Sequence, residues 1–115
     1  MQIQKLLVLG LALVSLVALG HTQLSSSIPA DDAALAAAPD QLQLTFSEPV
    51  TLTAVSIKDS QGSPYDLGAL PTATQRDFAI PMPALPAGSY VVGWRAVGAD
   101  THVVSGEIHF AIAAH

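Results

Sequence analysis

The sequence contains no cysteine among its 115 residues. A chain without thiols forms no disulfide, and it cannot supply the sulfur ligands of structural zinc sites or the Cys ligand that a blue-copper centre requires. Thiolate catalysis is excluded for the same reason. The stabilisation that disulfides often give to a small protein must therefore come from hydrophobic packing.

Positive charge is scarce as well. Four Lys and Arg residues stand against nine Asp and Glu residues, which gives a formal net charge of -5. Nucleic-acid binding depends on cationic side chains that neutralise phosphates, so this balance argues against nucleic acid as a partner. A chain of this length allows one ordinary domain and leaves no room for a separate catalytic module. We therefore expect one domain with one site.

The segment 1–20 has the pattern of a secretory signal peptide. A short polar start precedes an apolar run from Leu6 to Leu19, and Ala18 and Gly20 are the small residues expected before a signal-peptidase cut. The run falls short of the roughly 20 apolar residues that a membrane span needs, which disfavours the alternative of an uncleaved anchor. Without Cys at the cut, a lipoprotein anchor is excluded. We expect cleavage after Gly20, and a mature domain 21–115 that does not insert into the membrane.

The mature chain begins without clear periodicity and then becomes periodic. Residues 25–40 are rich in Ser, Ala, Asp and Pro, which predicts a loop, or a single helical turn around residues 32–36. Apolar and polar residues alternate over 41–46, which is typical of a half-buried strand. The alternation continues from Val50 and shifts phase near Ala54, so we expect a bulge or bend there.

Three more alternating segments follow, at 78–82, 90–95 and 107–112. Pro and Gly turns separate them, and no long segment has a helical period. This pattern favours an all-β fold, a small antiparallel sandwich or barrel. Met82 and Trp94 are in phase with the apolar residues of their segments, so both are expected in the core.

Cleavage after Gly20 would make His21 the first residue. A terminal His offers a metal two nitrogen atoms, its free amine and its ring Nδ1, which together close a chelate ring. The α-amino group, with a pKa of roughly 8, deprotonates readily when a metal competes, unlike a backbone amide. A His at this position can also be there only because the peptidase tolerates it. By itself it does not indicate a metal site, and further ligands are needed.

Asp100-Thr101-His102, in a polar turn between the last two predicted strands, supplies candidate partners. In an extended chain, residues two apart project to the same side, so the carboxylate and the imidazole can reach one ion. A lone triplet of this kind is usually only solvated. Combined with His21, however, the set of an amine, two imidazoles and a carboxylate suits tetragonal Cu(II), which also leads the divalent affinity order.

Longer motifs resemble the CopC family of periplasmic copper-resistance proteins. They are HTQLSSSIPADDAAL, LQLTFSEPV and PMPALPAGSYVVGWRAVGADTHVVSGEIHFAI, and in this order they cover essentially the whole mature chain. The resemblance implies a Greek-key, immunoglobulin-like β-barrel or sandwich in the periplasm. It also implies one Cu(II) per chain, held by His21, Asp100 and His102, and a CopD-type copper transporter of the inner membrane as partner.

Two departures from the family pattern concern the turn. The usual D-G-H reads Asp100-Thr101-His102, and a frequent Ser is Gly98; Thr adopts a positive φ less readily than Gly, which affects the turn geometry. Glu48 stands where the family keeps a carboxylate near the metal. It is a candidate for orienting a ligating imidazole through a hydrogen bond, the alternatives being direct ligation or a plain surface acid.

The other histidines and the methionine are assigned no metal role. His109 alternates with core residues and is expected to be solvated or at an edge, and the terminal His115 is expected to be mobile. Met82 is the only Met after the predicted cut, so we expect no Cu(I) site. Two alternatives to a copper carrier remain: an N-terminal-His copper enzyme like the lytic polysaccharide monooxygenases, and a metal-free adhesion sandwich. No nucleophile motif is present, and we expect no enzyme.

Overall fold

The structure, a computed structural model, describes residues 22–114. It contains seven strands: β1 (Leu24–Ile28), β2 (Ala33–Leu35), β3 (Gln41–Asp59), β4 (Pro64–Tyr65), β5 (Gln75–Pro81), β6 (Gly88–Gly98) and β7 (Val103–Ile112). Between residues 22 and 114 there is no helix, and hence no helix long and apolar enough to cross a membrane. The all-β class predicted from the alternation is confirmed.

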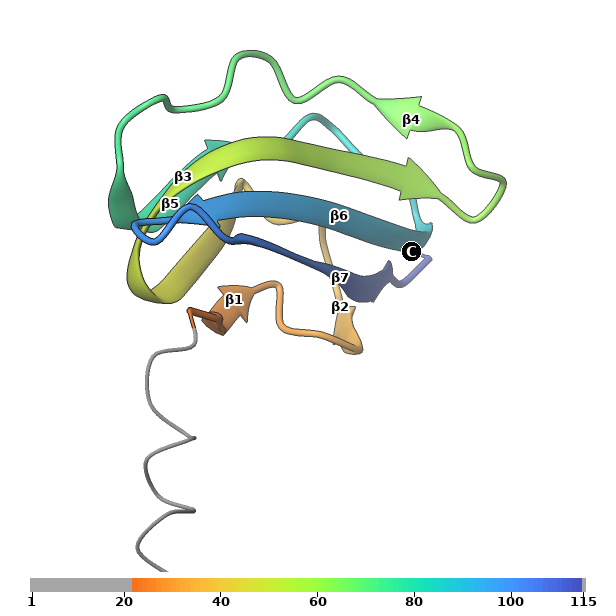
Figure 1. The fold of residues 1–115 in the computed structure, drawn as a ribbon. Helices are drawn as coiled ribbons and strands as arrows, with labels where there is room; N and C mark the ends of the chain where they lie inside the picture. Colours follow the sequence, from red (N-terminus) through yellow and green to blue (C-terminus); the bar gives the residue numbers. More distant parts are fainter. Residues whose placement is uncertain (1–21, 115) are drawn as a thin grey trace, which may run out of the picture.

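The long strand β3 links the two halves of the fold. Its first part pairs with β1 and β5, and its second part pairs with β6. Val50 lies at the corner, because it pairs with both Gln75 and Gly98. Just before it, Pro49 has no N–H to donate to a ladder, and the β3–β5 register shifts between Thr45 and Val50. Figure 1 shows the result, a curled sheet in which β3, β6 and β7 run side by side.

The predicted bulge near Ala54 is present. The register of β3 against β6 shifts between Leu52 and Ala54. The skipped residue, Thr53, donates its hydroxyl to the carbonyl of Arg95 at 3.1 Å. From Ala54 onward the two strands stay in register to Asp59, so the bend lies where the alternation changed phase.

The predicted helical turn around residues 32–36 is wrong, because this segment forms β2. Ala33 and Leu35 pair in parallel with Phe110 and Ile112 of β7, at the end of the sheet order β1-β3-β6-β7-β2. A single isolated turn of helix is costly to nucleate, whereas pairing with the edge of β7 satisfies the backbone groups of both segments. The other ladders of the described residues are antiparallel, as predicted.

The core forms from the inward side of the alternating segments, as predicted. The rings of Phe78 and Trp94 both meet that of Phe46 edge to face, at centroid distances of 5.9 and 5.3 Å. Trp94 is buried and Met82 is partly buried against the core, so both core predictions are confirmed. Among the described residues, no buried residue is polar or charged, which is consistent with a core that depends on apolar packing alone.

Candidate metal centre

A tight turn between β6 and β7 carries the predicted D-x-H triplet. The N–H of Gly98 donates to the carbonyl of His102, and the N–H of Thr101 donates back to the carbonyl of Gly98, both at 3.0 Å. These two bonds close the hairpin directly after the last strand pair, Val97 with Val103. The rigid ends of two paired strands therefore position the triplet.

Thr101 adopts a left-handed backbone conformation, with φ at 68°. Such a conformation costs a non-glycine residue about 1–3 kcal/mol, and a β-branched side chain is poorly suited to it. The Thr101 hydroxyl donates to the carbonyl of Asp100, which gives the side chain a partner within the turn. The change from the usual Gly therefore preserves the turn but introduces strain into it.

The two candidate ligands of the turn contact each other. Nδ1 of His102 lies 2.8 Å from Oδ2 of Asp100, and the backbone N–H of His102 donates to Oδ1 at 3.1 Å. The side-chain and backbone hydrogen bonds from His102 lower the pKa of Asp100 below its usual value of 3.8. Both side chains are open to solvent, His102 at 83% and Asp100 at 51% of their surface. An ion can therefore reach this pair without any opening of the fold.

The geometry of this pair fits metal binding in two ways. As placed, the carboxylate fixes the imidazole through Nδ1 and leaves Nε2 free, a common arrangement for a ligating His. Alternatively, an ion displaces the proton between the two atoms, and both side chains turn to face it. Adjacent donors at bond lengths of about 2.0 Å around a square ion are about 2.8 Å apart, which matches the observed separation.

The start of the described chain lies beside this pair. Gly98 has no side chain, and a Cβ built on it would lie 3.1 Å from Oδ1 of Asp100 and 3.2 Å from Oγ1 of Thr22. Thr22 and Asp100 therefore approach the same point on Gly98. His21, the third predicted ligand, directly precedes Thr22 but is outside the described residues. Its assignment stays a prediction.

Glu48 also belongs to this neighbourhood. The Thr22 hydroxyl donates to Oε2 of Glu48 at 3.0 Å, and Glu48 itself is exposed. Sequence reasoning placed Glu48 near the metal but could not identify Thr22 as its partner, because the two residues are 26 positions apart. The hydrogen bond from a ligating imidazole to Glu48 stays a prediction.

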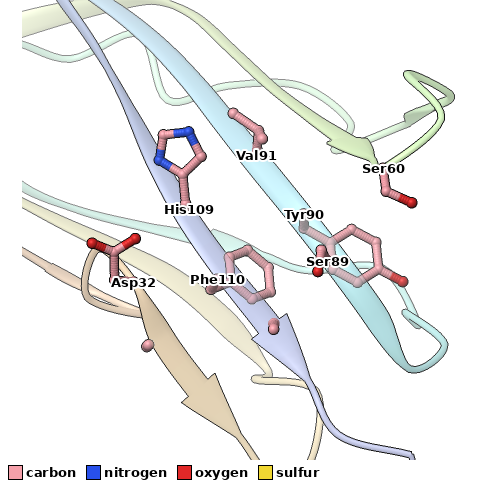
Figure 2. Close-up of a pocket in the computed structure, with 9 residues that line it drawn as sticks. Asp32, Ser60, Ser89, Tyr90, Val91, His109 and Phe110 are labelled. Atoms are coloured by element: carbon pink, nitrogen blue, oxygen red, sulfur yellow. The ribbon is translucent and has the colours of Figure 1, made fainter.

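His109 is exposed, as predicted, but it has partners that the sequence did not indicate. Asp31 accepts hydrogen bonds from the backbone N–H of His109 at 2.8 Å and pairs with its Nδ1 at 3.2 Å. Together with Asp32 these residues offer ligand atoms within 4.8 Å of one another. Figure 2 shows Asp32 and His109 on one side of a pocket, with Ser60 across it.

Hydrogen bonds between the loop before β2 and strand β7 explain why Asp31, Asp32 and His109 lie together. Asp32 donates its N–H to the carbonyl of His109 at 2.6 Å, so the loop before β2 is attached to β7 at residues 31 and 32. The two hydrogen bonds that Asp31 accepts, from the backbone N–H and from Nδ1 of His109, lower the pKa of Asp31. The backbone bond contributes most. His115, the remaining histidine, lies outside the described part of the chain.

Comparison with known proteins places this geometry in a family. The CopC domain matches residues 24–113. The chain is 40% identical over 117 residues to "Copper resistance protein C" of Escherichia coli, covering 92% of this chain and 90% of that protein. It is 29% identical over 112 residues to "Copper transport protein CutJ" of Bacillus subtilis, covering 93% of this chain but 21% of that protein.

A solved structure agrees with this match. The crystal structure of CopC from Methylosinus trichosporium OB3b superposes with a TM-score of 0.74 and 32% sequence identity, covering 83% of this chain and 96% of that one. Sequence and fold therefore lead to the same result: the chain belongs to the CopC family.

Proposed function

We propose that the chain is an exported Cu(II)-binding protein of copper homeostasis and resistance. It binds one Cu(II) through the amine and imidazole of His21, the carboxylate of Asp100 and the imidazole of His102. The observation that carries this proposal is the 2.8 Å pairing of Asp100 with His102, directly beside the first described residue of the chain.

Proximity of the chain start supports the inclusion of His21. Consecutive Cα atoms are about 3.8 Å apart across a trans peptide, so the residue before Thr22 is within reach of the turn that Thr22 contacts. The resulting set of nitrogen and oxygen donors is one that Cu(II) prefers, and without Cys or an additional Met there is no soft set for Cu(I). The amine exists only if the signal peptide 1–20 is removed, so the proposal includes cleavage after Gly20 and a periplasmic mature domain 21–115.

Exposure of the site supports a role in copper transfer. The side chain of His102 is 83% exposed and that of Asp100 is 51% exposed. A protein that accepts copper can therefore approach the ion directly. The neighbouring Val103 is one of two exposed large apolar side chains among the described residues. In Bacillus subtilis a similar segment is part of a longer protein that is named for copper transport. We propose a membrane copper transporter of the CopD type as the acceptor.

The names of the relatives weigh against the two alternatives. The two relatives described above are named for copper resistance and copper transport, and not for an enzyme or an adhesion module. An oxidative copper enzyme also needs a substrate face, and the few aromatic residues are mostly in the core: Phe46, Phe78, Tyr90, Trp94 and Phe110 are all buried. Copper storage or transfer without turnover is the function that these observations support.

A titration of the mature protein with Cu(II) tests the proposal. Isothermal calorimetry should show one tight step at a ratio of one ion per chain, and electron paramagnetic resonance should show a tetragonal nitrogen and oxygen site. Absence of a tight step would contradict the proposal and favour the alternative of a metal-free sandwich. Sustained oxygen consumption by the loaded protein with ascorbate would instead favour an oxidative enzyme.

A further inference from the structure

Three hydrogen bonds attach the start of the described chain to the corner of β3. The Thr22 hydroxyl donates to Oε2 of Glu48 at 3.0 Å. The N–H of Gln23 donates to Oγ of Ser47 at 3.0 Å, and the N–H of Ser47 donates to the carbonyl of Gln23 at 2.9 Å. The arm is therefore held at residues 22 and 23, before the regular pairing of β1 with β3 begins at Leu24.

These bonds direct the arm toward the candidate metal centre. The Oγ1 atom that donates to Glu48 is the same atom that would lie 3.2 Å from a Cβ on Gly98, where Oδ1 of Asp100 also approaches. Gly98 is buried, and its missing side chain lets Thr22 come this close. One hydroxyl group thus lies between the corner of β3 and the turn that carries the ligands.

We propose that Thr22 and Glu48 form a clamp that positions the N-terminal arm for copper capture, without either side chain ligating the ion. The inference rests on the proposed function, since it concerns the residue that follows the proposed ligand His21. A free chain end loses much conformational freedom when its amine and imidazole chelate an ion. Prior ordering of the arm by the clamp removes part of that cost and so tightens binding.

Among the three bonds, the one from Thr22 to Glu48 acts closest to the proposed ligand His21. Of the two between Gln23 and Ser47, one joins backbone groups only and the other ends on the Ser47 hydroxyl, and both fix the arm one residue further from its end. The bond from Thr22 acts next to residue 21, and an ionised acceptor makes it stronger than a neutral hydrogen bond. Copper affinity should therefore depend on Thr22, although a Thr hydroxyl is a poor ligand for Cu(II).

Four variants of the mature protein starting at His21 test the clamp. Thr22→Val keeps the shape of the side chain and removes the hydroxyl, and Glu48→Ala removes the acceptor. The double variant completes a double-mutant cycle, which measures the coupling between Thr22 and Glu48. Thr45→Val is the matched control, since Thr45 donates to Oδ1 of Asp77 in an equivalent exposed bond at 3.0 Å.

Cu(II) affinity is measured by competition with a chelator of known strength. We expect both single variants to bind about tenfold more weakly, in the range found for contacts that orient ligands. The double variant should be no weaker than either single one, and the control should bind like the wild type. Electron paramagnetic resonance should give the same spectrum for all, because the ligands are unchanged; a spectrum altered by Glu48→Ala alone would mean direct ligation and would overturn the clamp.

A measurement without copper separates the clamp from the proposed function. Amide order parameters of Thr22 and Gln23 should fall in Thr22→Val and Glu48→Ala, and stay unchanged in the control. If the wild type binds Cu(II) tightly but Thr22→Val keeps both its affinity and its order, the clamp is wrong and the proposed function stands. If the wild type binds no Cu(II), the proposed function fails, whatever the order parameters show.

Discussion

Asp100 accepts two hydrogen bonds from His102, one from the backbone N–H and one at Nδ1. Thr101, which lies between Asp100 and His102 in the sequence, has the left-handed conformation that reverses the chain at this point. The backbone bond holds the carboxylate against residue 102 and the side-chain bond orients the ring. The proposed binding of copper by Asp100 and His102 would therefore start from two side chains that already lie together.

Replacement of His102 by Ala tests the turn half of the proposed site. It should weaken Cu(II) binding by more than about a hundredfold, beyond what loss of an orienting contact costs, because a direct ligand disappears. His109→Ala is the matched control, since His109 is also exposed and also paired with an Asp. Equal affinities for His102→Ala and the wild type would contradict the assignment of His102, and a large loss in His109→Ala would move the site to the group around Asp31.

Strands β3, β5, β6 and β7 could be predicted because each one carries its own alternation, whereas β1 lies mostly in the segment 25–40 that was predicted as a loop. Residues 41–46 and 90–95 bury every second side chain, and the phase change at Ala54 marks the bulge in β3. The strand β2 carries no such signal. Its Ala-rich sequence is compatible with several local structures, and pairing with β7, more than 70 residues later, decides which one forms.

The candidate site was predictable to a similar extent. Asp100 and His102 are two residues apart, and the tight turn at Thr101, where an extended chain was assumed, brings them together. The bonds from Thr22 to Glu48 and from His109 to Asp31 join residues 26 and 78 positions apart, and only the folded sheet brings them into contact. Sequence reasoning therefore identified the triplet and, through the family resemblance, Glu48, but not the hydrogen bonds around them.

Replacement of Thr101 by Gly should stabilise the copper-free protein. Relief of the left-handed strain, about 1–3 kcal/mol, is partly offset by the greater freedom of Gly in the unfolded chain, about 0.5–1 kcal/mol. A net gain of about 1 kcal/mol is expected in urea unfolding. Ala99→Gly in the same turn is the control. Ala99 is not among the residues with positive φ, so this change should only destabilise; a loss of stability in both variants would show that Thr101 is not strained.

Acid should destabilise the copper-free fold partly through Asp100 and Asp31. Hydrogen bonds from His102 and His109 lower the pKa of these two carboxyl groups in the folded chain, below their usual value of 3.8. In the unfolded chain both groups bind protons more readily. Their contribution to stability is therefore present above about pH 4 and is lost as the pH falls through the folded pKa values.

Urea unfolding between pH 6 and pH 3 measures this effect. The wild type should lose stability on acidification more steeply than Asp100→Asn or Asp31→Asn, since neither Asn can take up the proton. Because both carboxylates are exposed, the difference should be small and reduced by salt. Parallel curves for all three proteins would show that these hydrogen bonds do not lower the pKa values.

The amine of His21 is the central element of the account, and one extra residue tests it. Mature protein starting at His21 is compared with the same protein carrying an additional Gly before it, which turns the amine of His21 into an amide but leaves its imidazole, Asp100 and His102 in place. Competition titration with Cu(II) should show a large loss of affinity in the extended protein, with a changed electron paramagnetic resonance spectrum. Unchanged affinity and spectrum would contradict the terminal chelate.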